Sequence, residues 1–275
     1  MTQAQAGTQA GTAAELAARA HNIRRNVVRM ATGKGEGYVG QGLDAAEILA
    51  ALFCSELRLG AGPDDDRFIL SPGHYSIALW AAMAEAGMLD AGLLDSYGAD
   101  GSDIIMSTHR GAVPGVELTG GSLAHGLPVA AGMAIANELA GRRGRVATFV
   151  SDGELQEGSQ WEAIMFAGHR RLSSLLMVLD VNRTQADGPL VIEHEPLVEK
   201  LRAFGWWCED VDGNDVSAIL AGLDAARADD RPKALVCRTR LANGVPLLMQ
   251  RDRAHFVRVG DDEWQTVADQ LEQGR

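Results

Sequence analysis

Two short apolar runs, each followed closely by a carboxylate, constrain the fold of this chain more than any other feature. They span residues 146–150 and 175–179, and Asp152 and Asp180 follow them. Such runs are too short for buried helices and predict buried strands of a parallel sheet. Residues 159–171, between them, have helical spacing. The pattern therefore predicts an α/β fold, with a parallel sheet flanked by helices on both faces.

Polar residues at the ends of these two strands predict a ligand site. Asp152 and Asn182 fall at the carboxyl edge of the sheet, where open parallel sheets bind their ligands. Both offer the oxygen ligands that Mg²⁺ prefers, usually alongside phosphate oxygens. Gly153 would let the backbone approach a diphosphate, and the next helix could direct its N-terminus at the anion. Asp-Gly alone is more often a plain turn, so the prediction depends on both loops together.

Charge and composition exclude several classes of function. The net charge is −12, with a pI near 5.0, which argues against nucleic acid or an anionic membrane surface as a partner. No apolar run approaches the roughly 18 residues of a membrane span, and no secretory leader pattern opens the chain. Three scattered cysteines, Cys54, Cys208 and Cys237, predict buried free thiols in a reducing compartment. We therefore expect a cytoplasmic protein.

Periodicity divides the chain into a tail and one domain. Residues 1–11 show no pattern and predict a disordered tail, and residues 12–275 predict a single domain. Asp44 and Glu47 have the spacing of a capping box, which predicts that Asp44 caps a helix over residues 45–57. Further helices are predicted over 79–94, with a break near Gly87, and over 195–204.

The two polar loops resemble a known cofactor motif. SDGELQEG, a following WEA and DVNRTQADG about thirty residues on are similar to the thiamine diphosphate motif of transketolases, and the resemblance extends over roughly residues 14–264. It implies the diphosphate-binding domain of that family, with thiamine diphosphate and Mg²⁺, or Ca²⁺ or Mn²⁺ in its place. The metal ligands implied are Asp152, the Asn182 side chain and the Thr184 carbonyl.

The same resemblance implies further site residues. His74, His109 and His255 match family histidines near cofactor and substrate, and His74 also contacts the cofactor there. The implied cofactor-binding loops contain Gly120, Gly121, Ser122, Gly153 and Glu154, together with Asp152 and Asn182.

Some positions depart from the family pattern. Tyr38 stands where the family has a substrate-binding His, Pro72 where it has Lys, and His125 where most members have Gln. These substitutions bear on the sugar and not on the cofactor. Glu157 matches a family Glu that couples two active sites across an interface. A solvated carboxylate in the first turn of a helix explains Glu157 equally well.

Family transketolases contain a second, pyrimidine-binding domain. The resemblance therefore implies the N-terminal half of a split enzyme, active with a separate C-terminal subunit, plausibly as α₂β₂. Such an enzyme transfers a two-carbon ketol unit from a ketose or ketose phosphate to an aldehyde acceptor. The alternatives are the α-type subunit of another thiamine diphosphate enzyme, acting on 2-oxo acids, and a non-catalytic scaffold.

Overall fold

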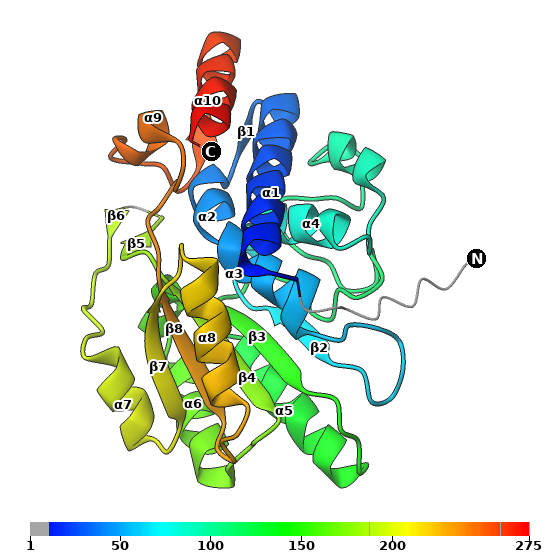
Figure 1. Cartoon of the computed structure of the whole chain (residues 1–275), viewed down its shortest axis with the longest axis vertical. Helices are drawn as coiled ribbons and strands as arrows, with labels where there is room; N and C mark the ends of the chain where they lie inside the picture. Colours follow the sequence, from blue (N-terminus) through cyan, green and yellow to red (C-terminus); the bar gives the residue numbers. More distant parts are fainter. Residues whose placement is uncertain (1–10, 187, 259, 275) are drawn as a thin grey trace.

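Five parallel strands form the central sheet of the protein (Figure 1). The computed structural model describes residues 11–186, 188–258 and 260–274. The predicted tail, residues 1–11, lies outside them apart from Gly11. In spatial order the strands are β2 (Arg67–Leu70), β3 (Val146–Ser151), β4 (Leu175–Val181), β8 (Lys233–Arg238) and β7 (Trp207–Asp212).

The two apolar runs are strands, as predicted. All residues of β3 and β4 are buried, because helices cover both faces of the sheet. β3 and β4 pair in parallel register, with Ser151 opposite Asp180 at their carboxyl ends. The polar residues that follow the two strands therefore emerge at one edge.

Two apolar cores lie on opposite faces of the sheet. The first contains buried residues of α1 (Ala13–Lys34), α2 (Val39–Asp44), α3 (Ala46–Ala51), α4 (Ser76–Glu85) and α8 (Val216–Ala226). The second contains residues of α5 (Gly126–Leu139), α6 (Gly158–Arg170) and α7 (Leu197–Ala203). Short α9 (Pro246–Met249) and longer α10 (Asp261–Gln273) follow the sheet in the chain. Two-stranded pairs join β1 (Glu36–Gly37) to β9 (Val257–Arg258) and β5 (Thr184–Gln185) to β6 (Gly188–Pro189).

The helix predicted over 45–57 is confirmed in outline, because α3 and a π-helical turn run without a break from Ala46 to Glu56, but the predicted Asp44 cap is wrong. The chain forms α2, which ends at Asp44, then α3, and then a π-helical turn, Leu52–Glu56. No side chain caps α3. Glu47 pairs instead with the buried Arg24, so both members of the supposed capping box have partners elsewhere. A real capping box starts α1 at Thr12.

Two other helix predictions differ from the structure mainly in their bounds. The break predicted near Gly87 within residues 79–94 is confirmed, since α4 ends at Glu85, Gly87 has a φ of 72°, and a 3₁₀ turn, Ala91–Ser96, follows. The helix predicted from residue 195 begins at Leu197, directly after Pro196. Within the described residues, no helix is both long and apolar enough to cross a membrane.

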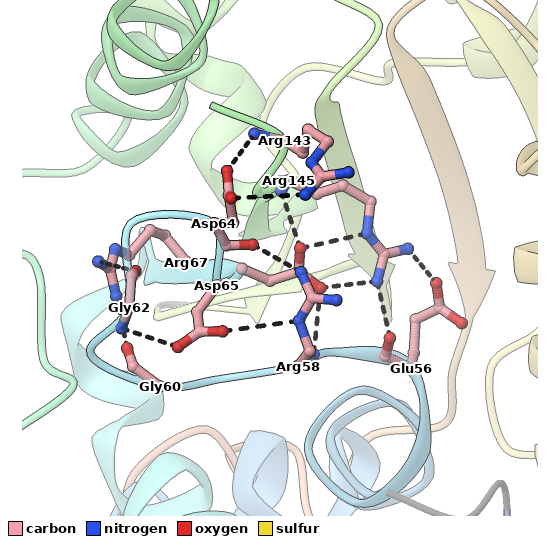
Figure 2. A network of polar contacts seen from close by, with 10 residues as sticks. Glu56, Arg58, Gly60, Gly62, Asp64, Asp65, Arg67, Arg143 and Arg145 are labelled. Carbon is pink, nitrogen blue, oxygen red and sulfur yellow. Dashed lines mark hydrogen bonds and ion pairs between the residues drawn. The ribbon is translucent and has the colours of Figure 1, made fainter. Parts of the chain in front are cut away.

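An ion-pair network occupies the amino ends of β2 and β3, opposite the polar edge (Figure 2). Arg145 contacts the carboxylates of Glu56 and of Asp66, the latter at 2.8 Å. Arg227 also reaches Glu56, at 2.6 Å. The carboxylates of Glu56 and Asp66 are almost fully buried, so this network fixes the segments before both strands.

Candidate functional site

The loops after β3 and β4 meet at the polar edge, as the sequence predicts. The backbone N–H of Arg183 donates to Asp152 Oδ2 at 2.6 Å. The N–H of Thr184 donates to Asn182 Oδ1 at 2.9 Å. The three predicted metal-binding residues therefore lie within two adjoining loops, and the strand register places them there.

Buried carboxyl groups surround Asn182. Asp44, Asp152 and Asp180 are each 1% exposed or less. Burial, with the nearby Asp180, raises the pKa of Asp152 to about 7. Burial raises the pKa of Asp180 to about 6, although Thr239 and Tyr75 donate to it. Burial and Asp180 likewise raise the pKa of Asp44. This much buried negative charge requires a compensating cation or protons.

A divalent cation fits this edge. Asp152 Oδ1 is buried without a hydrogen-bond partner, and no Lys or Arg side chain of the described chain pairs with Asp44, Asp152 or Asp180. No cluster of three or more His, Cys, Asp or Glu side chains in the described ranges could hold a metal. A metal held by Asp152, Asn182 and the Thr184 carbonyl would instead have mixed oxygen ligands, the kind that Mg²⁺ takes.

A cavity of about 380 Å³ opens beside these loops. It brings together residues that are far apart in the sequence and leaves room for an extended ligand. Its lining includes the predicted site residues Tyr38, His74, Gly121, Gly153, Glu157, Thr184 and His255.

Aromatic and imidazole rings form one wall of the cavity. The rings of His74 and His255 lie 5.0 Å apart, and Tyr38 packs 5.2 Å from His74 and 5.6 Å from His255. Gln41 Nε2 lies 2.9 Å from Nδ1 of His255. Burial and the neighbouring His255 lower the pKa of His74 to about 3. At neutral pH, His74 therefore offers a hydrogen bond and no charge.

Close backbone contact explains two glycines at the cavity. A Cβ at Gly73 would lie 2.8 Å from the Cα of Gly120, so neither position has room for a side chain. The N–H of Gly120 also donates to the carbonyl of Thr108 at 2.9 Å. Gly121 has a φ of 123° and open space beside it, and a Cβ at Gly153 would meet its nearest atom only at 3.7 Å. The backbone at Gly121 and Gly153 is therefore open to a ligand.

Other predicted residues lie outside the cavity lining. Glu154 is fully buried and accepts hydrogen bonds from Ser71 Oγ and from the N–H groups of Ala124 and Ser151. It joins three loops of the protein. Gly120, Asp152 and Asn182, described above, also lie outside the lining. The last four are His109 and Ser122 in exposed loops, exposed His125 directly before α5, and buried Pro72 before a 3₁₀ turn.

The structure also adds residues that the sequence interpretation missed. Asp44 accepts a hydrogen bond from Asn182 Nδ2 at 2.9 Å, and Tyr75 donates to Asp180 at 2.6 Å. Gln41, beside His255, is the third. The sequence signal for a functional role was that the carboxylate Asp44 and the amide Gln41 lie in or next to a glycine-rich loop. Because Asp44 and Glu47 have capping-box spacing, Asp44 was interpreted as a helix cap and its contact with Asn182 was missed.

The parallel sheet and the polar carboxyl edge define an α/β domain that binds its ligand at the carboxyl ends of the strands. The family model for the transketolase thiamine diphosphate-binding domain matches residues 17–273. The chain belongs to this family, whose domain binds thiamine diphosphate.

The chain resembles relatives of about its own length and also part of a longer, solved transketolase. It is 45% identical over 266 residues to a putative uncharacterized transketolase family protein of Sinorhizobium fredii, covering 93% of this chain and 95% of that one. It is 34% identical to the 6-deoxy-6-sulfo-D-fructose transketolase subunit SqwG of a Clostridium species, covering 91% of this chain and 94% of that one. The crystal structure of Campylobacter jejuni transketolase superimposes with a TM-score of 0.85 at 24% identity, covering 94% of this chain and 42% of that chain. The chain thus spans about two fifths of this solved transketolase.

Proposed function

We propose that this chain is the diphosphate-binding subunit of a two-component, Mg²⁺- and thiamine diphosphate-dependent transketolase. The buried, unpartnered Asp152 Oδ1 beside Asn182 carries the proposal, because a divalent cation satisfies it and would anchor a diphosphate. The reaction proposed is transfer of a two-carbon ketol unit from a ketose, or ketose phosphate, to an aldehyde acceptor. When bound, thiamine diphosphate supplies the carbanion chemistry that cleaves and forms the carbon–carbon bonds.

The residues of this chain would bind the metal and the diphosphate and orient the sugar. Asp152, the Asn182 side chain and the Thr184 carbonyl would hold the metal, and the open backbone at Gly121 and Gly153 would approach the diphosphate. His74 and His255 would face the sugar and donate or accept hydrogen bonds at its hydroxyl groups. We retain His109 as a third candidate, since Thr108 beside it is bonded to the Gly120 loop.

A partner subunit is part of the proposal. The chain matches a relative named as a subunit over nearly its whole length, and it spans only 42% of a solved transketolase. We propose a C-terminal, pyrimidine-binding partner, an α₂β₂ assembly and a cytoplasmic location. Glu157 lies exposed on the cavity rim, where it could couple subunits. Residues 12–275 form the single domain of this subunit.

We propose a specialised sugar as substrate. The relative SqwG is named for a sulfonated ketose, and Tyr38 occupies the wall where family members have a substrate-binding His. The described cavity lining contains no Lys or Arg, and His74 is neutral. An anionic tail, either phosphate or sulfonate, would therefore be held by the partner subunit.

Titration calorimetry tests this proposal directly. Thiamine diphosphate is titrated with and without Mg²⁺, and with and without the partner chain, into the wild type, Asp152→Ala and the control Asp230→Ala. Asp230 is an exposed ion-pair residue far along the chain, before β8. We expect binding that requires Mg²⁺, strengthens with the partner, persists in Asp230→Ala and is lost in Asp152→Ala.

Activity assays complete the test. The reconstituted pair should convert a ketose and an aldehyde and leave pyruvate unchanged. Binding without turnover on any ketose would favour a scaffold, and turnover of pyruvate would favour a 2-oxo acid enzyme. Efficient turnover of ordinary pentose phosphates would contradict the specialised sugar.

A further inference from the structure

The amide of Asn182 has an unusual set of partners. Its Nδ2 donates to Asp44 Oδ2 at 2.9 Å and lies 3.3 Å from Asp180 Oδ2. Its Oδ1 points to the other side, where it accepts from the N–H of Thr184. An ionised carboxylate accepts hydrogen bonds and repels an amide oxygen, so these two aspartates in their ionised form, together with the N–H of Thr184, favour one of the two amide orientations.

Asp44 is held rigidly where it meets Asn182. It ends α2, whose residues are all buried. A Cβ on Gly40 would lie 2.2 Å from the carbonyl of Ala254, and one on Gly42 would lie 2.8 Å from Val27. The side chain of Asn214 also donates to the Asp44 carbonyl at 3.1 Å. The segment therefore has no freedom to move away from Asn182.

A purely structural role does not explain Asp44. Its carboxyl group is fully buried, and its Oδ1 has no hydrogen-bond partner. No cationic side chain pairs with it within the described ranges. Buried carboxyl groups that serve only stability are normally paired or fully hydrogen-bonded, because burial of an unsatisfied one costs free energy. Among the residues that the structure describes, Asn182 is the one whose side chain donates a hydrogen bond to Asp44 Oδ2.

We infer that Asp44 is a positioning residue that fixes the amide of Asn182 with Oδ1 directed away from Asp44 and Asp180, so that this oxygen is the one available to a metal. This inference rests on the proposed function, since it assigns Asn182 as a ligand. Residues that orient metal ligands through a hydrogen bond typically change metal affinity about 10- to 100-fold when they are removed. Asp180, held by Tyr75 and Thr239, supports the same orientation from the other strand end.

The test compares Asp44→Ala with the conservative Asp44→Asn in the full chain. Free Mn²⁺ is followed by EPR in the presence of thiamine diphosphate, with the partner chain added where the wild type requires it. We expect Asp44→Ala to weaken Mn²⁺ binding about tenfold or more. Asp44→Asn keeps an acceptor oxygen and should restore binding to near the wild-type value. Equal affinity of all three proteins would overturn the inference.

A second measurement separates positioning from folding. The hydrogen exchange of the Asn182 side-chain amide, followed by NMR, needs no cofactor. We expect faster exchange in Asp44→Ala than in the wild type, with Asp44→Asn close to the wild type; unchanged exchange in Asp44→Ala would contradict the inference. Asp152→Ala is run in parallel. If Asp152→Ala abolishes Mn²⁺ binding while Asp44→Ala does not, only the role of Asp44 fails. If Asp152→Ala binds Mn²⁺ normally, the proposed metal site itself is wrong.

Discussion

Burial shifts the titration of single side chains at the polar edge in opposite directions. It raises the pKa of Asp152 and Asp180 and lowers that of His74, because the charged form is disfavoured in each case. As the pH falls, the raised pKa values of the two carboxyl groups increase the stability of the folded protein, whereas the lowered pKa of His74 decreases it. A single variant can isolate the histidine contribution.

His74→Asn should change how stability depends on pH. The pKa of His74 is about 3 when folded, against about 6.5 in an unfolded chain. Between these values the unfolded state binds the proton and the folded state does not, so acidification destabilises the wild type through this residue. From pH 7 to pH 5 the wild type should lose about 2 kcal/mol relative to His74→Asn.

Urea unfolding at several pH values measures this difference. The control is His169→Asn, since His169 lies exposed in α6. Parallel pH curves for the wild type and His74→Asn would mean that folding does not change the pKa of His74.

At the scale of elements, buried strands were predictable and the segment around Asp44 was not. β3 and β4 are buried on both faces, and a continuous apolar run is the direct signature of that burial. Asp44 and Asn182 are separated by 138 residues, so local patterns contain no signal for their contact. The loops of Asp152 and Asn182 were predictable because strand order alone brings them together.

The packing of α6 depends on one glycine. A Cβ on Gly168 would lie 1.8 Å from the carbonyl oxygen of Phe204, which precedes β7. Gly168→Ala should therefore force the two segments apart and cost about 2–3 kcal/mol of unfolding free energy. The control is Gly132→Ala in α5, where no atom lies within 4 Å. This control should be neutral or stabilise by up to about 1 kcal/mol. Equal denaturant midpoints for both variants would show that α6 can shift at no cost.

At the scale of the molecule, the two ends of the sheet have different roles. Among the described residues, the carboxyl end gathers buried acidic groups without basic partners. The amino end holds the network of Glu56, Asp66, Arg145 and Arg227, of which Figure 2 labels Glu56 and Arg145. The carboxyl end is therefore suited to binding a ligand, and the amino end stabilises the fold. Loss of the network should therefore leave the cofactor site unchanged.

Arg145→Met should destabilise the protein by about 2 kcal/mol, because it removes the cation that Glu56 and Asp66 share while both stay buried. The side chain of Arg143 is 87% exposed, so Arg143→Met should change stability by less than about 0.5 kcal/mol. Thermal unfolding gives the stabilities, and calorimetry should find the thiamine diphosphate affinity of folded Arg145→Met unchanged. A weakened affinity would contradict the separation of the two ends.

The contact between Gly73 and Gly120 has a consequence for how such a protein can diversify. The backbones of the two loops touch at these glycines, and the Ser107 side chain fills the space beside them, so neither glycine can gain a side chain without its neighbours moving. Tyr38, by contrast, lines the cavity with its ring and can be exchanged by itself. Directed evolution towards a new sugar should therefore accumulate its changes on the ring-bearing wall and leave the glycine contact invariant.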